Sequence, residues 1–508
     1  MRTTEADPGR DPSRRSLLRA GLGAAAWATL SSSCGDGSVS RPATAASPRS
    51  AASAGVPRIA VVGAGLAGLT CAYELARHQI ACTVYEANPD RVGGRCWTSR
   101  GWAHGQTAEH GGEFIDTVHH EIRGLAAELG LRLDDLDALP RRRPRPRDRY
   151  FLGGSVRGAG EVYAGYHLLR LRADRDARRI GHFTYDRAGH AARALDEMTA
   201  EQWLEDALGH DDPLLRTATT QYMAEEYGLD PARLSAINMV TEFAGGGLPS
   251  DERFHVRGGN DQLVSGLVDR LPDGTVVRDA ALTRLVRSRS GGYRLGFATA
   301  PDVAVDVVVL CAPFTALRRV DLDGSGLSPR KLSCVRSLGM GTNAKVLLQL
   351  DGRVTDYGAT PTQRWSGGYY DARVDTWDSS ATEAGSSGLL TVYSGGHVGA
   401  SYGPARAHSP APVRVVRRTL AEIGRAVPDL PRGYAGRSWL DSWVDDPHTH
   451  GSYAAFEPGQ FTRYWGFVGL PEHRVHFAGE HTSRRALGFL EGAVESGRRA
   501  AREVLAGR

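Results

Sequence analysis

The sequence predicts an α/β fold in which a parallel-sheet unit is interleaved with a second unit made of a mixed sheet and helices. Short apolar runs followed by glycine-rich turns and helical patterns occur near residue 60 and again near residue 480. The 508 residues exceed what one compact core usually holds, because domains take about 100 to 200 residues. Hydrophobic residues at 41% and charged residues at 24% exclude a collagen-like, coiled-coil or wholly disordered chain.

The first 55 residues are expected to be an export signal and a flexible linker. Ser13–Arg19 carries an arginine pair and leads into an apolar run over residues 20–30, which resembles a twin-arginine signal. The run is shorter than the ~20 apolar residues of a membrane-spanning helix. Cleavage after Ala45 and lipid attachment at Cys34 both stay open, although Ser31 stands where a lipid-attachment signal has an aliphatic residue. We therefore expect a secreted or cell-envelope protein that meets the twin-arginine translocon during export.

The first glycine-rich turn predicts a dinucleotide site. The apolar run Arg58–Val62 precedes Gly63-Ala64-Gly65-Leu66-Ala67-Gly68, and a helical pattern and a short strand then lead to Glu86. Such glycines let the backbone approach a pyrophosphate at a helix N-terminus, and an acid about 20 residues later can hold ribose hydroxyls. The motif does not choose between NAD and FAD. The residues expected to bind the cofactor here are Gly63, Gly65, Leu66, Ala67, Gly68, Glu86 and Ala87.

A second glycine-rich turn favours FAD. Arg91-Val92-Gly93-Gly94-Arg95 follows soon after Glu86 and resembles the second turn of FAD enzymes with a glutathione-reductase-type fold. That resemblance implies that Gly93 and Gly94 line the site and that Arg95 reaches the cofactor phosphates or the flavin. The expected fold is therefore an FAD-binding, Rossmann-like domain combined with a mixed sheet-plus-helix substrate domain.

The C-terminal region resembles the closing segment of a known family. Val475–Ser483 contains Phe-Ala-Gly-Glu and is expected to be a last sheet strand with a tight turn, and Gly488 opens a helix that runs towards Leu505. Together with the N-terminal motifs, this segment resembles the flavin amine oxidase family, which includes monoamine oxidases, polyamine oxidases and L-amino-acid oxidases. The resemblance implies that Glu480 binds the ribityl chain and that the helix dipole stabilises the reduced flavin. It adds Gly112, Glu113, Leu282, Gly479, Glu480, Gly488, Phe489 and Leu490 to the cofactor-binding residues.

The spacing of the motifs predicts a discontinuous cofactor domain. Asp251–Leu263 resembles the return of the chain into that domain, and Val307–Pro313 resembles its buried strand before the crossover. The predicted segments are 56–120, 250–335 and 440–508 for the FAD-binding domain, and 121–249 and 336–439 for the substrate-binding domain.

Lys345 is the predicted catalytic cation. The chain contains only two lysines, Lys331 and Lys345. Leu338–Val346 resembles the family segment whose lysine holds a water beside flavin N5, which implies that role for Lys345. A charged residue at the start of an apolar strand needs a partner, because unpaired burial is costly. A structural salt bridge is therefore the alternative.

Two aromatic residues match the walls that flank the substrate nitrogen in amine oxidases. They are Tyr453 and Phe489, and the alternative is that either ring belongs to the core. Ser452 stands where animal monoamine oxidases carry a cysteine linked to FAD, so the resemblance implies noncovalent FAD. The expected reaction transfers a hydride from the carbon beside a neutral amine to flavin N5. Water then hydrolyses the imine, and oxygen becomes hydrogen peroxide.

The segment Gly111–Asp116 bears on the substrate. L-amino-acid oxidases of the family carry a carboxylate-binding arginine here, and this chain has Phe114. Asp116 matches an acid that attracts a distant ammonium in polyamine oxidases, and Glu113 is close by. We therefore expect an amine substrate, while an L-amino acid stays open because an arginine could come from the substrate domain. Phe114, Asp116, Trp365 and Tyr453 are the expected substrate-binding residues, and Glu225–Gly228 with Trp365 either line the pocket or belong to a helix end and the core.

Other classes are weaker matches to the sequence. A flavin desaturase or tailoring oxidase of a larger metabolite would not need the aromatic slot, and a non-catalytic FAD protein would need neither the slot nor the lysine. The net charge of +4 and scattered basic residues argue against nucleic acid. The exception, Arg141–Arg149, is rich in proline and is expected to be an exposed loop, either solvated or touching an anion or membrane. The six cysteines lack zinc or disulfide spacing, so buried thiols and no metal are expected, and a homodimer stays open.

Overall fold

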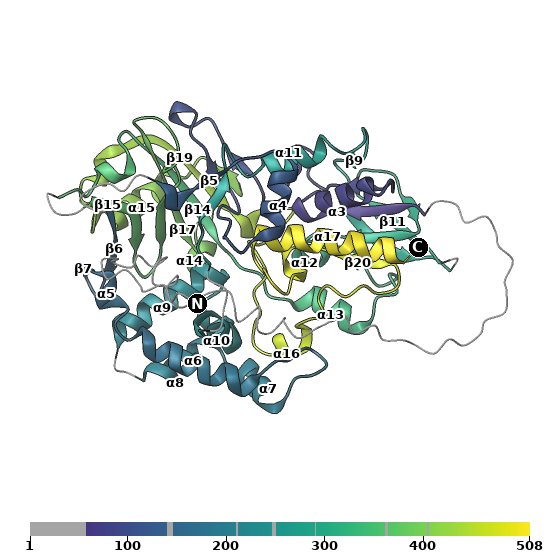
Figure 1. Ribbon diagram of the computed structural model, residues 1–508, viewed down its shortest axis with the longest axis horizontal. Helices are drawn as coiled ribbons and strands as arrows, with labels where there is room; N and C mark the ends of the chain where they lie inside the picture. The colour runs from purple at the N-terminus through teal and green to yellow at the C-terminus, as the bar shows by residue number, and fades with distance from the viewer. Residues whose placement is uncertain are drawn as a thin grey trace, which may run out of the picture.

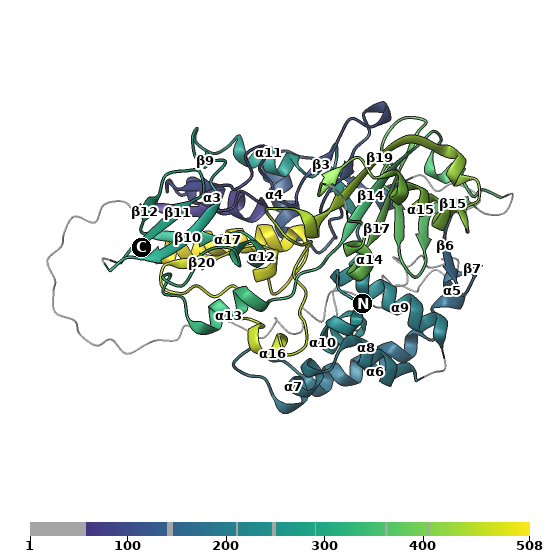
Figure 2. The same ribbon diagram turned by 180° about the vertical axis from the view of Figure 1, so that it is seen from behind.

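The computed structural model describes residues 57–139, 146–209, 212–245, 250–289, 291–360, 364–403 and 406–507. The predicted export signal, Cys34 and the whole predicted linker lie outside these residues. Figures 1 and 2 show a lobe that contains α3, α17 and β20 beside a second lobe with a large sheet and a helical layer. The predicted α/β fold class, with a parallel sheet and a mixed sheet, is confirmed.

The first lobe is built on a five-stranded parallel sheet with the order β20-β13-β1-β2-β9. Its central strands are short and fully apolar, which suits a sheet covered on both faces. Residues far apart in the sequence therefore pair directly, such as Ile59 with Val307. The strands are β1 (Ile59–Val62), β2 (Thr83–Tyr85), β9 (Val276–Val277), β13 (Val307–Leu310) and β20 (Val475–Phe477).

Helices α3 (Leu66–Arg77) and α17 (Leu490–Ala506) pack closely together in this lobe, beside α4 (His120–Glu128). The approach is close because Gly497 has no side chain, and a Cβ there would lie 2.4 Å from the Ala67 carbonyl oxygen. Arg498 joins the three helices through ion pairs with Glu74, Glu121 and Glu128.

Smaller elements complete the first lobe and its connections. Three strands form an antiparallel sheet, and four short strands form two antiparallel pairs. The strands are β10 (Leu282–Arg287), β11 (Tyr293–Phe297), β12 (Val303–Val305), β3 (Thr98–Ser99), β4 (Ala108–Glu109), β5 (Leu133–Asp135) and β8 (Phe254–Val256), and the helices are α11 (Gln262–Val268), α12 (Phe314–Leu317), α13 (Pro329–Ser337) and α16 (Phe461–Tyr464).

The second lobe contains an eight-stranded mixed sheet with the order β18-β19-β14-β17-β16-β15-β6-β7. Its centre, β14, is buried along its whole length and pairs with both neighbours in antiparallel register. The strands are β6 (Pro146–Leu152), β7 (Ser155–Arg157), β14 (Ala344–Leu350), β15 (Arg364–Tyr370), β16 (Asp375–Asp378), β17 (Gly388–Ser394), β18 (His408–Ser409) and β19 (Tyr434–Ser442), and helices α14 (Gly396–Ala400) and α15 (Val413–Gly424) belong to this lobe.

Part of the arginine-rich stretch was wrongly predicted to be a loop. Residues 140–145 lie outside the described residues, but β6 begins at Pro146 and includes Arg147 and Arg149. Proline is tolerated at the first position of a strand. Arg149 is buried and donates a hydrogen bond to the Gly358 carbonyl. The buried guanidinium of Arg149 is thus stabilised by a backbone carbonyl acceptor.

A layer of helices connects β7 to the first lobe. Figure 1 shows α6 to α10 gathered below the mixed sheet. Side chains at the N-termini fix the starts of two of them: Thr199 forms a capping box with Gln202, and Asp212 accepts from the Leu215 amide. The helices are α5 (Ala159–Val162), α6 (Tyr166–Ile180), α7 (His190–Glu197), α8 (Ala200–Leu208), α9 (Pro213–Tyr227) and α10 (Ala236–Phe243).

Within the described part of the chain, no helix has the length and apolar character needed to cross a bilayer. The same residues hold five cysteines, all free thiols, of which four are buried.

One of the two lysines has a purely structural position. Lys331 on α13 is fully buried, and its ammonium donates to the carbonyls of Phe467, Val468 and Leu470 at 3.1, 2.8 and 2.9 Å. The same nitrogen lies 4.1 Å from the centre of the Phe477 ring. Burial lowers the pKa of Lys331 to about 8, so the cation holds the turn after α16 at neutral pH.

We expect Lys331→Met to lower the free energy of unfolding by about 3 kcal/mol, because three buried carbonyls lose their donor. Chemical denaturation followed by circular dichroism measures the change. Arg336→Met on the same helix is the matched control, since its exposed pair with Asp323 contributes little. Equal stability of the two variants would contradict a supporting role for the buried ammonium.

Candidate active site

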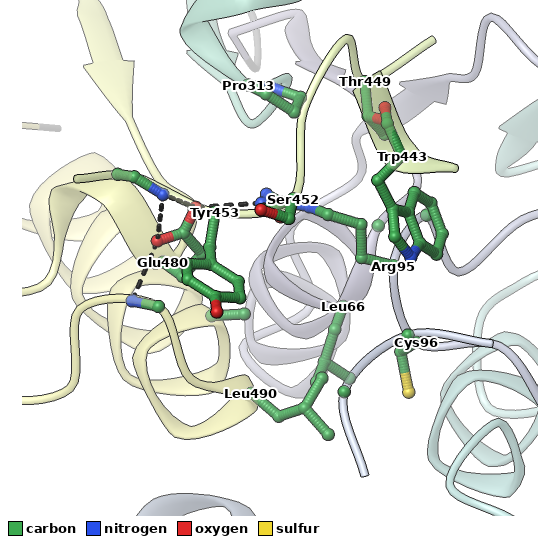
Figure 3. Close-up of a pocket in the computed structure, with 18 of the residues that line it drawn as sticks. Leu66, Arg95, Cys96, Pro313, Trp443, Thr449, Ser452, Tyr453, Glu480 and Leu490 are labelled. Carbon is green, nitrogen blue, oxygen red and sulfur yellow. Dashed lines mark hydrogen bonds and ion pairs between the residues drawn. The ribbon is translucent and has the colours of Figure 1, made fainter. Parts of the chain in front are cut away.

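A cavity of ≈ 490 Å³ lies between the two lobes. The first lobe contributes the glycine turns and the C-terminal segment, and the second contributes β14, β16, β17 and the ends of α9 and α10. Figure 3 shows one side of the cavity, where Leu66 and Leu490 lie below Arg95, Glu480 and Tyr453. The cavity therefore has a half formed by dinucleotide-type motifs and a half formed by the mixed sheet and helices.

The glycine turns form a cradle that fits a dinucleotide. Gly63 has φ +102°, and a Cβ on Gly68 would lie only 2.0 Å from the Gly63 carbonyl oxygen, so both positions require glycine. Gly65 faces open space at the start of α3. Glu86 lines the cavity with its carboxylate held by the amides of Ala64 and Asn88 at 2.7 and 2.8 Å. The cradle matches the predicted cofactor site, except that Gly68 packs inside the turn and does not line the cavity.

Glu480 ties together three segments around the cavity. It accepts from Arg95 Nη1 at 3.0 Å, a pair labelled in Figure 3, and from the amides of Ala454 and Gly488 at 3.2 and 2.9 Å. Arg95 also donates to the Ser452 carbonyl. Both charged side chains line the cavity, so their neutral pair presents polar atoms to a cofactor without an uncompensated charge.

The remaining residues predicted to bind the cofactor also line the cavity. They are Leu66, Ala67, Ala87, Gly93, Gly94, Gly112, Glu113, Leu282, Gly479, Gly488, Phe489 and Leu490.

Lys345, the second residue of β14, lines the cavity and is 5% exposed. Its ammonium donates to the Glu109 carbonyl at 3.0 Å, the Gly111 carbonyl at 2.8 Å and the Glu113 carboxylate at 3.0 Å. An ammonium has three N–H donors, and each one meets an acceptor. The salt bridge considered for Lys345 therefore exists, and it lies in the cavity wall.

A buried chain of histidines and acids borders the lysine. His110 Nδ1 lies 2.9 Å from both oxygens of Asp441, which is the cross-strand partner of Lys345. His408 places Nδ1 2.7 Å from Asp441 and Nε2 3.0 Å from Asp446. Both ring nitrogens face carboxylates, an arrangement that stabilises the protonated form of the ring. Burial opposes this charge, but the bonds to Asp441 and Asp446 prevail, and the pKa of His408 is raised.

Aromatic side chains line the substrate half of the cavity. The Tyr453 hydroxyl lies 2.8 Å from that of Tyr393 and donates to the Glu225 carbonyl at 2.7 Å. A Cβ on Gly488, the residue before Phe489, would lie 3.6 Å from the Tyr453 ring. The Phe489 ring contacts the ring of His119 at a centroid distance of 5.1 Å. Tyr453 and Phe489 both line the cavity.

Acidic side chains gather in this half of the cavity. Tyr222 and Tyr227 both donate to Glu242, the second at 3.0 Å. Burial first, and then the charges of Glu242 and Glu226, hold the pKa of both phenols well above their ordinary value. The acids that line the cavity here are Glu225, Glu226, Glu242 and Asp375. The sequence left open whether Glu225 and Glu226 line the pocket, and the structure places both in its wall. Glu242 and Asp375 belong to no recognisable motif, so the sequence did not predict them.

Two predicted substrate-binding residues do not line the cavity. Trp365 is fully buried in the core of the second lobe, where its indole donates to the Gly368 carbonyl. Asp116 is 1% exposed and accepts from the amides of Asp251 and Glu252. It therefore orders the loop that reaches the cavity and does not meet a substrate itself. Phe114 does line the cavity and packs against Trp377.

Fold and site together define a flavin-dependent oxidoreductase. The profile of the family described as flavin containing amine oxidoreductase matches residues 66–505, so the chain belongs to that family. Its relatives are FAD-dependent oxidoreductases that act on amines or amino acids.

Sequence relatives and solved structures cover most of the chain. The L-amino-acid oxidase of Vipera ammodytes ammodytes is 24% identical over 469 residues, 88% of this chain and 92% of that protein. The L-amino-acid oxidase of Siganus canaliculatus is 27% identical over 486 residues, 88% and 85% of the two chains. Putrescine oxidase bound to putrescine (TM-score 0.74, 22% identity) and cyclohexylamine oxidase from Brevibacterium oxydans (0.73, 20%) each cover 89% of this chain and 99% of their own. These two structures establish the fold.

We expect Asp116 to make stability depend on pH. Burial, and then the nearby charge of Glu252, raise the pKa of Asp116 from 3.8 to about 7 in the folded protein. The folded state then binds more protons than the unfolded state between about pH 4 and 7, so stability falls as pH rises through that window. In Asp116→Asn, whose amide oxygen still accepts from the loop, this part of the fall disappears. Melting temperatures of both proteins from pH 4.5 to 7.5 test it, and parallel curves would contradict the assignment.

Proposed function

We propose that this protein is an FAD-dependent oxidase of amines that carry a second positive charge, such as diamines and polyamines. It oxidises a C–N bond of a primary or secondary amine to an imine, which water hydrolyses, and it passes the electrons to oxygen as hydrogen peroxide. The observation that carries the proposal is the group of acids beside the aromatic wall of the cavity.

The charges favour a cationic substrate. Among the described residues that line the cavity, the arginines are Arg95 and Arg319. Arg95 is paired with Glu480, and Arg319 follows α12 on the cofactor side, where burial first and then the charge of Arg319 lower the pKa of His450. Glu242 accepts hydrogen bonds from two phenols, and Asp375 lies on the strand next to that of Tyr393. An ammonium gains Coulomb energy from such a group, whereas a carboxylate is repelled.

The flavin, when bound, supplies the redox chemistry by accepting a hydride from the carbon beside the substrate nitrogen. The residues of this chain would divide the remaining work. Glu86, Arg95 and Glu480 would hold the cofactor through hydrogen bonds and charge. Tyr453 and Phe489 would exclude water and orient the reacting amine. Lys345 places a fixed cation in the wall between the two halves of the cavity.

Oxidation of an L-amino acid is the second candidate function. The curated sequence relatives named above are L-amino-acid oxidases, although at 24 to 27% identity. A substrate of this class would need a cation for its carboxylate, and Arg319 is the described arginine in the cavity wall outside the Glu480 pair.

Export and cofactor attachment are further parts of the proposal. The arginine pair in Ser13–Arg19 and the short apolar run after it support export by the twin-arginine route, which carries folded proteins. Ser452 supports noncovalent FAD, because its hydroxyl cannot form a thioether.

We expect turnover to require the distant charge of the substrate. Purified protein should release peroxide faster from putrescine than from butylamine, which has the same chain without the second ammonium. Glu242→Gln should raise KM for putrescine roughly tenfold through the loss of one Coulomb contact, with little change for butylamine. Peroxide assays with both amines measure this difference.

Glu242→Asp is the matched control, because it keeps the charge in a shorter side chain. Turnover confined to L-amino acids would contradict the amine assignment while the flavin chemistry would stand. An equal rise in KM for both amines would show that Glu242 supports the cavity and does not recognise the second ammonium.

We expect FAD to leave the protein on denaturation. Precipitation of the yellow protein with acid should release all flavin into the supernatant, since no thioether can form at Ser452. Absorbance of supernatant and pellet measures the partition. Flavin retained in the pellet would contradict noncovalent attachment.

A further inference from the structure

Glu113 is a fully engaged carboxylate in the cavity wall. One oxygen accepts from Lys345 Nζ at 3.0 Å, and the other accepts from Trp377 Nε1 at 2.8 Å and Ser379 Oγ at 3.0 Å. Its side chain is 9% exposed. The sequence predicts Glu113 as a cofactor-binding residue close to the acid Asp116, whereas these contacts engage its carboxylate within the protein.

The two charges of the pair cancel. Burial alone would raise the pKa of Glu113, but the Lys345 ammonium and the Trp377 hydrogen bond outweigh burial, and the pKa is lowered. Glu113 is therefore ionised, and Lys345 is an ammonium with three acceptors. This part of the wall has no net charge, although it holds two buried ions.

The register of the mixed sheet places this neutral pair next to the acidic side. Lys345 pairs with Tyr393 on β17, and Tyr393 pairs with Asp375 on β16. Directly paired residues point to the same face, and neighbouring strands lie about 4.8 Å apart. Lys345 and Asp375 are thus about 10 Å apart on one face. Tyr393 stands between them with its hydroxyl on Tyr453.

We propose that Glu113 is a positioning residue that neutralises Lys345, so that the wall formed by this pair adds no net positive charge to the cavity. This inference rests on the proposed function. It assigns Glu113 a part in substrate orientation: the distant ammonium of a dication goes to the acidic side, and the other amine lies beside the aromatic pair at the neutral side. Without the carboxylate, an uncompensated cation would repel that amine.

Equilibrium binding of 1,4-diguanidinobutane, a dication of putrescine length, tests the inference on the FAD-loaded protein by calorimetry at low salt. Glu113→Gln keeps an oxygen for Trp377 and Ser379 but leaves the cation uncompensated, and it should weaken binding roughly tenfold. Lys345→Met alone should not weaken binding. The double variant Glu113→Gln/Lys345→Met is again neutral and should bind within about threefold of wild type.

Ser379→Ala is the matched control, because it removes a hydrogen bond from the same carboxylate and leaves the charge in place. It should bind as wild type does. A double variant as weak as Glu113→Gln, or a Glu113→Gln protein that binds normally, would overturn the inference while the proposed function stood. A wild-type protein that does not bind the dication would overturn both.

Discussion

The burial of the Lys345 ammonium is the constraint on which the cavity depends. A charged group removed from water needs full compensation, and the three acceptors all come from the short segment Glu109–Glu113 of the first lobe. The lysine itself belongs to β14 of the second lobe. One cation therefore holds the two lobes together at the point where the cavity forms. Trp443 adds a bond from its indole to the His110 carbonyl, so the next carbonyl of this segment is also satisfied.

Charges alternate along one row of the mixed sheet. Asp441, Lys345, Tyr393 and Asp375 are successive cross-strand partners on β19, β14, β17 and β16. Two of these buried charges have an opposite partner from outside the row: His408 for Asp441, and Glu113 for Lys345. The strand spacing therefore sets the order acid, cation, phenol and acid along the row, and Lys345, Tyr393 and Asp375 line the cavity.

The sequence predicted the cofactor half of the cavity far better than the substrate half. Gly63, Gly65 and Glu86 lie within one strand–helix–strand unit (β1, α3 and β2), and their spacing reflects the backbone geometry of that local unit. Glu242 and Asp375 line the same cavity only because the tertiary fold brings α10 and β16 to it, and no local sequence pattern records that arrangement. Asp116 and Trp365 were wrongly placed for the same reason, since an acid or an indole near a motif can serve the core as well as a site. Arg147 and Arg149 show that a proline-rich sequence can still form a strand where neighbouring strands, here β15 and β7, pair with it.

The parallel sheet has a consequence for how the chain matures. Strands β1 and β20 are separated by more than 400 residues, and both are needed beside β13. During synthesis the glycine turn at Gly63 emerges more than 400 residues before Glu480 and α17. Strand β1 finds its partners β2 and β13 earlier, but β20 joins β13 only after this long interval. The cradle is therefore incomplete until β20 and α17 have been made, because α17 covers α3 and contributes Leu490 to the cavity wall.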